Sequence, residues 1–232
     1  MSFSKDVVCI IAEYLAKYEL LDWIDIERLS WSFLSENPNA IDLLRANPDK
    51  IDWKWLCTNP SAMELLEDNS FELHWGFLSM NSSAIKLIKY NLRKANWDCL
   101  SLNSAAIKIL KANPDKINWK WLSANPAAID LLKDNSSKID WVWLSLNPSA
   151  MSLLNSNPDR INWYHLSANS AAIELLRANP DRINWRKLSQ NSAAIDLLKT
   201  NPDKIDWEYL QRNPSIFELK IDTKLITKLL EI

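Results

Sequence analysis

Apolar and polar positions recur along this chain with a period of 22 residues, without an insertion or deletion. When each copy is counted from its Trp as position zero, Leu stands at position three in all nine copies. Positions nine, ten, twelve and thirteen are apolar in almost every copy. A unit of this length cannot bury its own apolar face, so neighbouring units have to stack. The pattern therefore predicts one elongated repeat array.

Polar residues mark two helices in each copy. Asp or Asn precedes most of the Trp residues and is a good N-cap for a short helix A that runs to about position five. Asn at position six is followed only by Pro or Ser, which is typical of the start of a second helix, helix B. A further Asn at position sixteen, five times followed by Pro-Asp, ends helix B.

We therefore expect an all-α fold, a right-handed α-solenoid of nine 22-residue helix-turn-helix repeats with terminal capping helices. At ~8 to 10 Å per unit, the array should be a rod or gentle superhelix about 70 to 90 Å long. Its repeat core should contain the Trp at position zero and the Asn at position six. These residues are Trp53, Trp75, Trp97, Trp119, Trp141, Trp163 and Trp185, with Asn59, Asn81, Asn103, Asn125, Asn147, Asn169 and Asn191.

Two other architectures share parts of this pattern. A leucine-rich repeat has a similar period and uses Asn ladders, but it needs a strand in every unit. This chain has Val only at 7, 8 and 142 and Gly only at 76, which is a composition poor in strand formers. A long amphipathic helix interrupted by Pro, as in lipid-binding apolipoproteins, conflicts with two break signals per copy. The sequence favours the helical solenoid over both.

The ends of the chain depart from the repeat. Apolar side chains recur at helical spacing in residues 5–18 and predict one amphipathic helix, and a second short helix is expected at residues 20–24. Asp222 is a candidate N-cap for a last helix. The expected regions are an N-terminal capping region of helices at 1–28, nine repeats at 29–220, and a C-terminal capping helix at 221–232.

The composition is that of a soluble folded protein, with 47% apolar and 24% charged residues. A net charge of −2 gives no overall attraction to nucleic acid or to an anionic membrane. Cys9, Cys57 and Cys99 match neither a disulfide framework nor zinc ligands. Because the N-terminus resembles neither a signal peptide nor a membrane span, we expect an intracellular protein of the cytoplasm or nucleus, with a virion as the alternative.

No motif for catalysis stands out. A phosphate loop, a nucleophile elbow, a zinc pair and a carboxylate dyad are lacking. His74 takes an N-cap place and His165 takes a variable place on helix A, so neither is a candidate metal ligand. We expect a non-enzymatic protein without a metal or cofactor. A protein partner is expected, whereas nucleic acid and membrane are not.

Position two of helix A is the candidate partner site. It lies about 200° around the helix from the Trp, so a polar residue is expected there. Six of the nine copies carry an aromatic ring instead, and apolar residues flank them at position five. Exposed apolar rows of this kind mark partner sites, and the alternative is that the rings are core in a middle layer. The candidate residues are Phe33, Trp55, Phe77, Trp121, Trp143, His165, Tyr209, Met80, Leu102 and Leu146.

Position nineteen forms a basic column. Asp at position eighteen neutralises much of its charge, so a solvated face is expected there. The column consists of Lys50, Lys94, Lys116, Lys138, Arg160, Arg182 and Lys204.

Two resemblances bear on function. The run K-D-V-V-C-I-I-A-E-Y-L at residues 5–15 resembles the first helix of F-box domains, which dock an adaptor of ubiquitin ligases, although it lacks the usual Leu-Pro opening. The unit I-D-W-x-x-L-S-x-N-P-x-A-I-x-L-L-x-x-N-P-D-K is similar to tandem repeats of uncharacterised proteins from large and giant DNA viruses, over residues 29–220. These resemblances imply a viral protein that recruits a host partner. The F-box-like resemblance implies that residues 5–25 dock the ubiquitin-ligase adaptor.

Two function classes follow. The first is a non-enzymatic protein-protein interaction scaffold that uses the repeat-built surface. The second is a structural or spacer component of a viral particle or assembly, held by its edges and ends.

Overall fold

The structure is a computed structural model that describes residues 16–69 and 73–220. The F-box-like segment at 5–15 and the capping helix expected at 221–232 lie outside the described residues. Within them the expected all-α solenoid of helix-turn-helix repeats is confirmed, because helices recur every 22 residues and sheet is confined to one short pair of strands.

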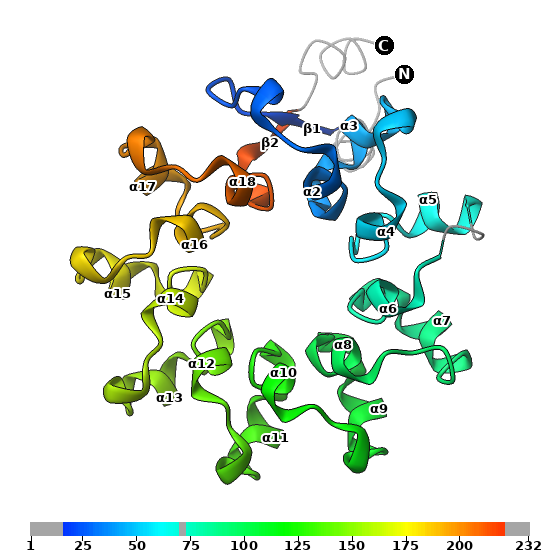
Figure 1. The fold of residues 1–232 in the computed structure, drawn as a ribbon, viewed down its shortest axis with the longest axis vertical. Helices are drawn as coiled ribbons and strands as arrows, with labels where there is room; N and C mark the ends of the chain where they lie inside the picture. The colour runs from blue at the N-terminus through cyan, green and yellow to red at the C-terminus, as the bar shows by residue number, and fades with distance from the viewer. Residues whose placement is uncertain (1–15, 70–72, 221–232) are drawn as a thin grey trace, which may run out of the picture.

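Helix A of each repeat lies on the inner side of the molecule (Figure 1). Each of these helices begins at the Trp of its repeat. The series is α2 Trp31–Glu36, α4 Trp53–Leu56, α6 Trp75–Leu78, α8 Trp97–Leu102, α10 Trp119–Ser123, α12 Trp141–Leu144, α14 Trp163–Leu166, α16 Trp185–Ser189 and α18 Trp207–Leu210.

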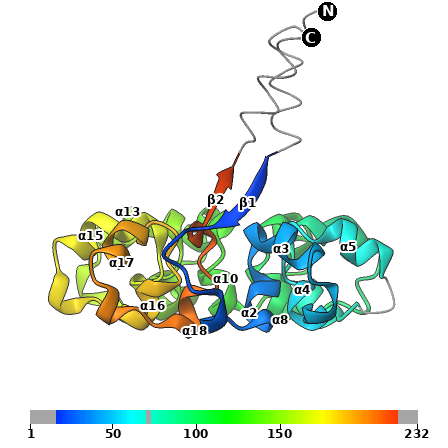
Figure 2. The same cartoon turned by 90° about the horizontal axis from the view of Figure 1, so that it is seen from above.

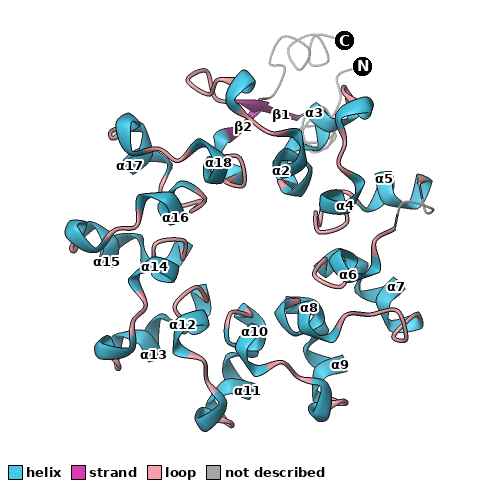
Figure 3. Cartoon of the chain, viewed as in Figure 1, coloured by secondary structure: helices cyan, strands magenta, loops and turns pink. Residues whose placement is uncertain are grey.

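Helix B of the first eight repeats lies on the outer side (Figure 3). A 3-10 turn leads into most of these helices, as Pro126–Ala128 leads into α11. A second 3-10 turn, such as Pro114–Lys116, connects one repeat to the next. The series is α3 Ile41–Arg45, α5 Met63–Asp68, α7 Ile85–Tyr90, α9 Ile107–Lys111, α11 Ile129–Lys133, α13 Met151–Asn155, α15 Ile173–Arg177 and α17 Ile195–Lys199.

Helices of four to six residues are marginal alone, and side-chain caps compensate for the few hydrogen bonds that they make. Asn118 Oδ1 accepts from the backbone N–H of Trp121 at 3.2 Å, at the start of α10. Asn125 Oδ1 accepts from the N–H of Ala127 at 2.9 Å, before α11. Asn135 Nδ2 donates to the carbonyl of Leu131 at 2.9 Å and ends the same repeat. The recurring Asn residues thus set the helix boundaries.

The repeats close into a ring, and the rod expected from the sequence is wrong. Each Asn at position six donates through Nδ2 to two carbonyls of the preceding repeat, as Asn125 does to Ser101 and Asn103, both at 2.9 Å. Asn37 of the first repeat donates in the same way to Gln211 and Asn213 of the last, at 3.0 and 3.1 Å. A rotation of about 40° per repeat brings nine repeats back to their start, and the sum of such rotations sets solenoid curvature.

A short antiparallel sheet joins the two ends of the ring. Strand β1 Lys17–Leu20 pairs with β2 Phe217–Lys220, and both strands project to one side of the ring (Figure 2). The sequence predicted a helix through residue 18, a short helix at 20–24 and a ninth helix B at Phe217–Lys220. The first is wrong at Lys17 and Tyr18, which lie in β1, and the other two are wrong throughout. Other copies bury Leu or Ile at position thirteen, whereas the ninth has Lys220 there, so a helix would lack its buried anchor.

The N-terminal segment completes the last repeat. The 3-10 turn η1 Ile26–Arg28 stands at the same distance before Trp31 as the turn Pro114–Lys116 stands before Trp119. In the repeats the connecting turn places its basic residue over the Trp of the preceding helix A. Arg28 takes that place over Trp207 across the ends of the chain.

The core is a continuous layer between the inner and outer helices. Leu122, Ala128 and Leu132 show the pattern, because each is fully buried and their equivalents in other repeats are buried too, except for Lys220 in the ninth. The Trp at position zero is half-buried and packs against this core. The exposed basic column at position nineteen lies over the Trp rings, with cation-to-centroid distances from 4.3 Å for Lys138 to 5.0 Å for Arg182. It is therefore a cover for the Trp rings and not only a solvated face.

Candidate binding channel at the ring centre

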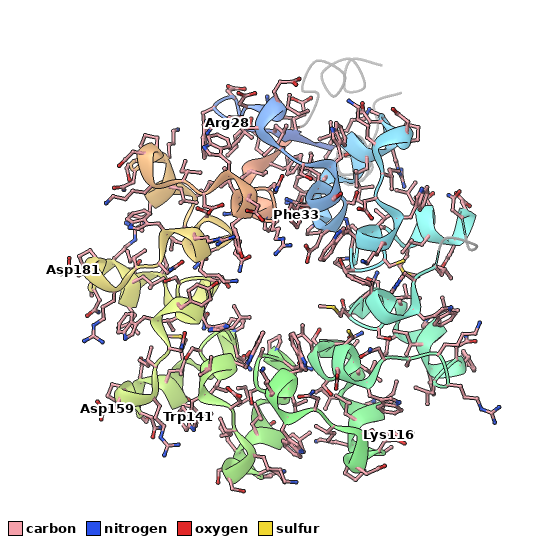
Figure 4. All side chains as sticks on the ribbon, in the orientation of Figure 1. Arg28, Phe33, Lys116, Trp141, Asp159 and Asp181 are labelled. Atoms are coloured by element: carbon pink, nitrogen blue, oxygen red, sulfur yellow. The ribbon has the colours of Figure 1, made fainter. Side chains whose placement is uncertain are left out.

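The centre of the ring holds a cavity of about 360 Å³. All the side chains that line it stand at position five of helix A and come from seven of the nine repeats, so it lies between opposite walls of the ring. Figure 4 shows side chains of the inner helices, with Phe33 labelled among them, on the side that faces this centre. The lining residues are Glu36, Thr58, Met80, Leu102, Ala168, Gln190 and Arg212.

The row at position two follows the inner wall beside this cavity. All nine of its side chains are half-buried, so they are neither core residues nor fully exposed. The rings contact each other from repeat to repeat: the Trp55 and Phe77 centroids are 5.1 Å apart, and those of Trp121 and Trp143 are 4.5 Å apart. The rings thus form two series of tilted or edge-on contacts along the wall, Phe33–Trp55–Phe77 and Trp121–Trp143–His165, which we call the ring stack. The row consists of Phe33, Trp55, Phe77, Cys99, Trp121, Trp143, His165, Lys187 and Tyr209.

The two aromatic rows of helix A have different neighbours. The Trp residues at position zero pack against the buried core, because they face the outer helices. At position two Phe77 also touches that core, whereas Trp55, Trp121 and Trp143 pack against rings of adjacent repeats. A helix with 100° per residue separates the rows in this way. The inner row therefore keeps part of its apolar surface free toward the centre.

The seam of the ring carries an ion pair in the channel wall. Arg212 of the last repeat lies 3.3 Å from Glu36 of the first, between Nε and Oε2. The Arg212 guanidinium also lies 4.2 Å from the Phe33 centroid and 5.7 Å from that of Tyr209, so the stack continues across the seam. Burial raises the pKa of Glu36, and the charge of Arg212 opposes this shift.

Cys99 interrupts the stack and leaves a second cavity. This cavity has a volume of about 220 Å³ and lies between repeats three and five, where most other copies have a ring. Its lining includes Met80 and Leu102, which also line the central cavity, together with Trp121. Burial, and then the charge of Asp98, raises the pKa of the Cys99 thiol. A protonated thiol is a small apolar group, which suits a receptor pocket better than a nucleophile.

A cationic sector lies opposite this pocket. Arg186 pairs with Asp206 and Glu208, each at 3.6 Å, whereas Lys187 makes no ion pair among the described residues. Lys187 Nζ instead lies 4.9 Å from the Tyr209 centroid. Burial, and then the charges of Arg212 and Arg186, lowers the pKa of Lys187. The channel wall therefore has an aromatic and apolar sector and a more polar sector, in which Arg186 and Arg212 are paired with carboxylates and Lys187 is not.

The pKa of His165 is also lowered in this sector. Burial is the main cause, and the charge of Lys187 adds to it. His165 Nδ1 lies 3.1 Å from Asn162 Oδ1, and its ring lies 5.1 Å from Trp143. A neutral imidazole serves here as a member of the ring stack.

The structure brings the sequence-predicted partner residues together on one inner wall. Met80 and Leu102 line both cavities, and Leu146 is half-buried at the same helical position. Sequence reasoning missed five residues that line the central cavity at position five: Glu36, Thr58, Ala168, Gln190 and Arg212. These residues could have been found from their position in the repeat. All stand at position five, as Met80, Leu102 and Leu146 do, and residues at one helical position face the same side.

The predicted core residues lie where the ring is held together. Every Asn at position six is buried and bonds to the preceding repeat. A second link runs through position four, where Ser123 Oγ donates to the carbonyl of Trp119 at 2.8 Å and accepts from the N–H of Asp140 at 3.0 Å. At the seam Gln211 replaces Ser and its Oε1 accepts from the N–H of Ser30.

In residues 16–69 and 73–220, no group of three or more His, Cys, Asp or Glu side chains is placed to hold a metal ion. No helix in those ranges is long and apolar enough to cross a membrane. Comparisons with protein-family models, with curated proteins and with solved structures found no match to this chain.

Proposed function

We propose that the ring is a non-enzymatic interaction scaffold whose central channel binds a segment of another protein. The observation that carries this proposal is that the buried positions of each repeat are constant, whereas the positions that face the channel vary. Leu at position three and Asn at position six are constant and buried, whereas positions two and five vary from repeat to repeat and face the channel. Variable side chains on a constant frame provide a recognition surface.

The chemistry of the wall indicates the kind of segment. Aromatic and apolar side chains such as Trp121, Trp143 and Leu102 supply the contact surface that dominates protein recognition. Cavities of about 360 and 220 Å³ accommodate individual side chains rather than a folded domain. We therefore propose an extended segment with apolar anchors, one of which occupies the Cys99 pocket.

A display selection with random peptides tests this proposal. Peptides are selected on the wild-type ring and counter-selected on Trp121→Ala with Trp143→Ala, and the Kd of enriched peptides is then measured by calorimetry. Val142→Ala is the matched control, because Val142 lies in the same helix α12 and is exposed. We expect peptides rich in apolar residues that bind wild type and Val142→Ala equally and lose at least about tenfold in affinity for the double variant.

Three outcomes speak against the channel as a binding site. The first is a selection that enriches no sequence over background. The second is an enriched peptide that binds the double variant unchanged. The third is unfolding of the double variant at 25 °C, because it would mean that the inner rings are core. The first outcome would favour the second function class, a structural spacer in an assembly.

The viral context and the adaptor remain separate proposals. Recruitment of a host protein to a ubiquitin ligase through residues 5–25 rests on the F-box-like resemblance of residues 5–15. Purified adaptor and the full chain provide the test, with a chain that lacks residues 1–15 as the control. Binding to the full chain alone supports adaptor recruitment, and equal binding to both chains removes it.

A further inference from the structure

The outer wall of the ring changes its charge pattern at repeats three and four. Position eleven, on the solvent side of helix B, is Lys86 in the third repeat and Lys108 in the fourth. In the other seven copies it is acidic or Ser, and in the seventh copy Glu174 pairs with Arg177 at position fourteen, at 3.7 Å. In the third and fourth copies both positions are Lys, so such a pair cannot form. The residues of the other copies are Asp42, Glu64, Asp130, Ser152, Glu174, Asp196 and Glu218.

The turn between these two repeats adds to the positive charge. It reads Asn91-Leu92-Arg93-Lys94, whereas five other turns read Asn-Pro-Asp followed by Lys or Arg. Arg93 therefore stands where the other turns have Asp. We call Lys86, Lys89, Arg93, Lys108 and Lys111 the basic patch. All five are exposed, and none makes an ion pair with a described residue.

An apolar cavity lies within the basic patch. It has a volume of about 380 Å³ and separates the outer helices α7 and α9, which Figure 1 shows side by side. Leu92 stands in the turn at the place of the usual Pro and forms part of its wall. Ile85, Ala105, Ile109 and Ala112 form most of the rest, and the side chains of Lys86, Lys89 and Lys108 border it.

Beside the patch, Tyr90 is 85% exposed. An exposed ring next to unpaired cations and an apolar cavity is a combination found at protein-binding sites. The surplus of like charge also favours a partner that supplies the missing carboxylates.

We propose that this outer site binds an acidic protein segment that inserts an apolar side chain between α7 and α9. Charge complementarity favours an acidic partner, because the basic patch carries Lys or Arg at places where most other repeats carry Asp or Glu. The cavity decides between protein and other polyanions, because a nucleic acid backbone carries no apolar side chain to fill it. This site faces away from the channel, so it does not depend on the function proposed for the ring centre.

Two variants restore the pattern of the other repeats and should keep the fold. Lys86→Glu with Lys108→Glu places at position eleven the residue type that Glu64 and Glu174 occupy. Leu92→Pro with Arg93→Asp converts the turn to the Asn-Pro-Asp-Lys form that the chain already uses elsewhere. The matched control for the Lys86 and Lys108 pair is Lys133→Glu with Lys199→Glu, which makes the same change of net charge on the outer wall of other repeats.

The probe is a fluorescein-labelled peptide of Glu residues around a central Leu-Phe pair, and binding to the full chain is followed by anisotropy. We expect binding that weakens with salt, and an increase in Kd of about tenfold or more for each of the two patch variants. The control pair and Trp121→Ala with Trp143→Ala should change the Kd by less than about twofold. A peptide with Ala-Ala in place of Leu-Phe should bind at least about tenfold more weakly.

Several results would overturn this proposal. Equal loss of binding in the control pair would show a general response to net charge, and equal binding of the Ala-Ala peptide would remove the role of the cavity. Tighter binding of an oligo-dT strand or of phosphatidylserine vesicles than of the peptide, abolished by the same patch variants, would assign the site to nucleic acid or to a lipid surface. Absence of peptide binding would also contradict it.

Discussion

The guanidinium of Arg28 lies 4.0 Å from the ring centroid of Trp207, although 179 positions separate the two residues in the chain (207 − 28). The same contact recurs within the array, as between Lys204 and Trp185 at 4.5 Å. The N-terminal segment thus contacts the last repeat in the way that each connecting turn contacts the repeat before it. Closure of the ring uses the contacts that join neighbouring repeats, and the strand pair adds to them.

A disulfide between the two strands should therefore form within one molecule. Tyr18 and Leu219 are partners in the antiparallel register, and both are exposed. We expect Tyr18→Cys with Leu219→Cys to form an intramolecular disulfide on mild oxidation, because facing strand residues are within the Cα separation that a disulfide spans. The background carries Cys9→Ala, Cys57→Ser and Cys99→Ala, and the readout is electrophoretic mobility with and without reductant.

The control for this experiment is Tyr18→Cys with Glu174→Cys, which places the second thiol on α15 in another part of the ring (Figure 1). It should give no monomeric disulfide. A rod would hold residues 18 and 219 at opposite ends, so oxidation of the first pair to dimers only would contradict the ring.

The Asn ladder should be more costly to disrupt than an ordinary helix cap. Asn125 is fully buried, accepts one hydrogen bond from Ala127 and donates two to the preceding repeat. Loss of a cap alone costs ~0.5 to 2 kcal/mol, and each buried carbonyl left without its donor adds to this cost. We expect Asn125→Ala to lower the free energy of unfolding by about 2 to 4 kcal/mol in urea titrations.

Asn135→Ala is the comparison, because Asn135 is half-buried and donates only within its own repeat. It should cost about 1 kcal/mol. Equal losses for the two variants would mean that the bonds between repeats contribute nothing beyond capping.

The sequence predicted the repeat, the two helices and the capping role of Asn, because these depend on residues close together in the chain. It did not predict closure of the ring. Closure depends on the total of small rotations between successive repeats, and no single residue determines that total. Two local signals pointed to the seam. Lys220 replaces the apolar residue of position thirteen, and Arg28 stands before Trp31 at the spacing of the turn Pro114–Lys116.

The sequence predicted the aromatic row of the candidate site, but only two of the seven residues that line the central cavity, Met80 and Leu102. The excess of rings at position two distinguished Trp121 and Trp143 from core residues of ordinary helices. Their place on the inside of a ring follows from closure, so it could not be read from the helical wheel. Glu36 and Arg212 form a pair only because the first and last repeats meet.

The Glu36–Arg212 pair predicts a dependence of stability on pH. Burial raises the pKa of Glu36 above its ordinary value of 4.5. A carboxyl with a raised pKa in the folded state contributes its stability below the unfolded pKa, and the contribution is lost as the pH rises through the folded value. We therefore expect the free energy of unfolding of wild type, relative to Glu36→Gln, to fall from pH 4.5 towards neutral pH.

Urea titrations of both proteins across this range provide the measurement, and Glu67→Gln is the control because Glu67 is exposed on α5. The control should show no fall of this kind. A difference between wild type and Glu36→Gln that rises with pH would mean that attraction to Arg212 outweighs burial.

Cys99→Phe should close the gap in the stack and block the channel pocket. Position two accepts Phe at 33 and 77 in the same helical setting, and the cavity of about 220 Å³ beside Cys99 provides room for the ring. Filling it adds ring contacts with Trp121, each worth ~0.5 to 1.5 kcal/mol, so the melting temperature should stay equal or rise. Peptides that bind the channel should lose at least about tenfold in affinity, because their anchor competes with the new ring.

Cys57→Ser is the matched control, since Ser is the usual residue at position four and Cys57 is buried away from this cavity. Unchanged peptide affinity in a stable Cys99→Phe protein would show that the Cys99 pocket is not used, and a lowered melting temperature would show that the gap is too small for a ring.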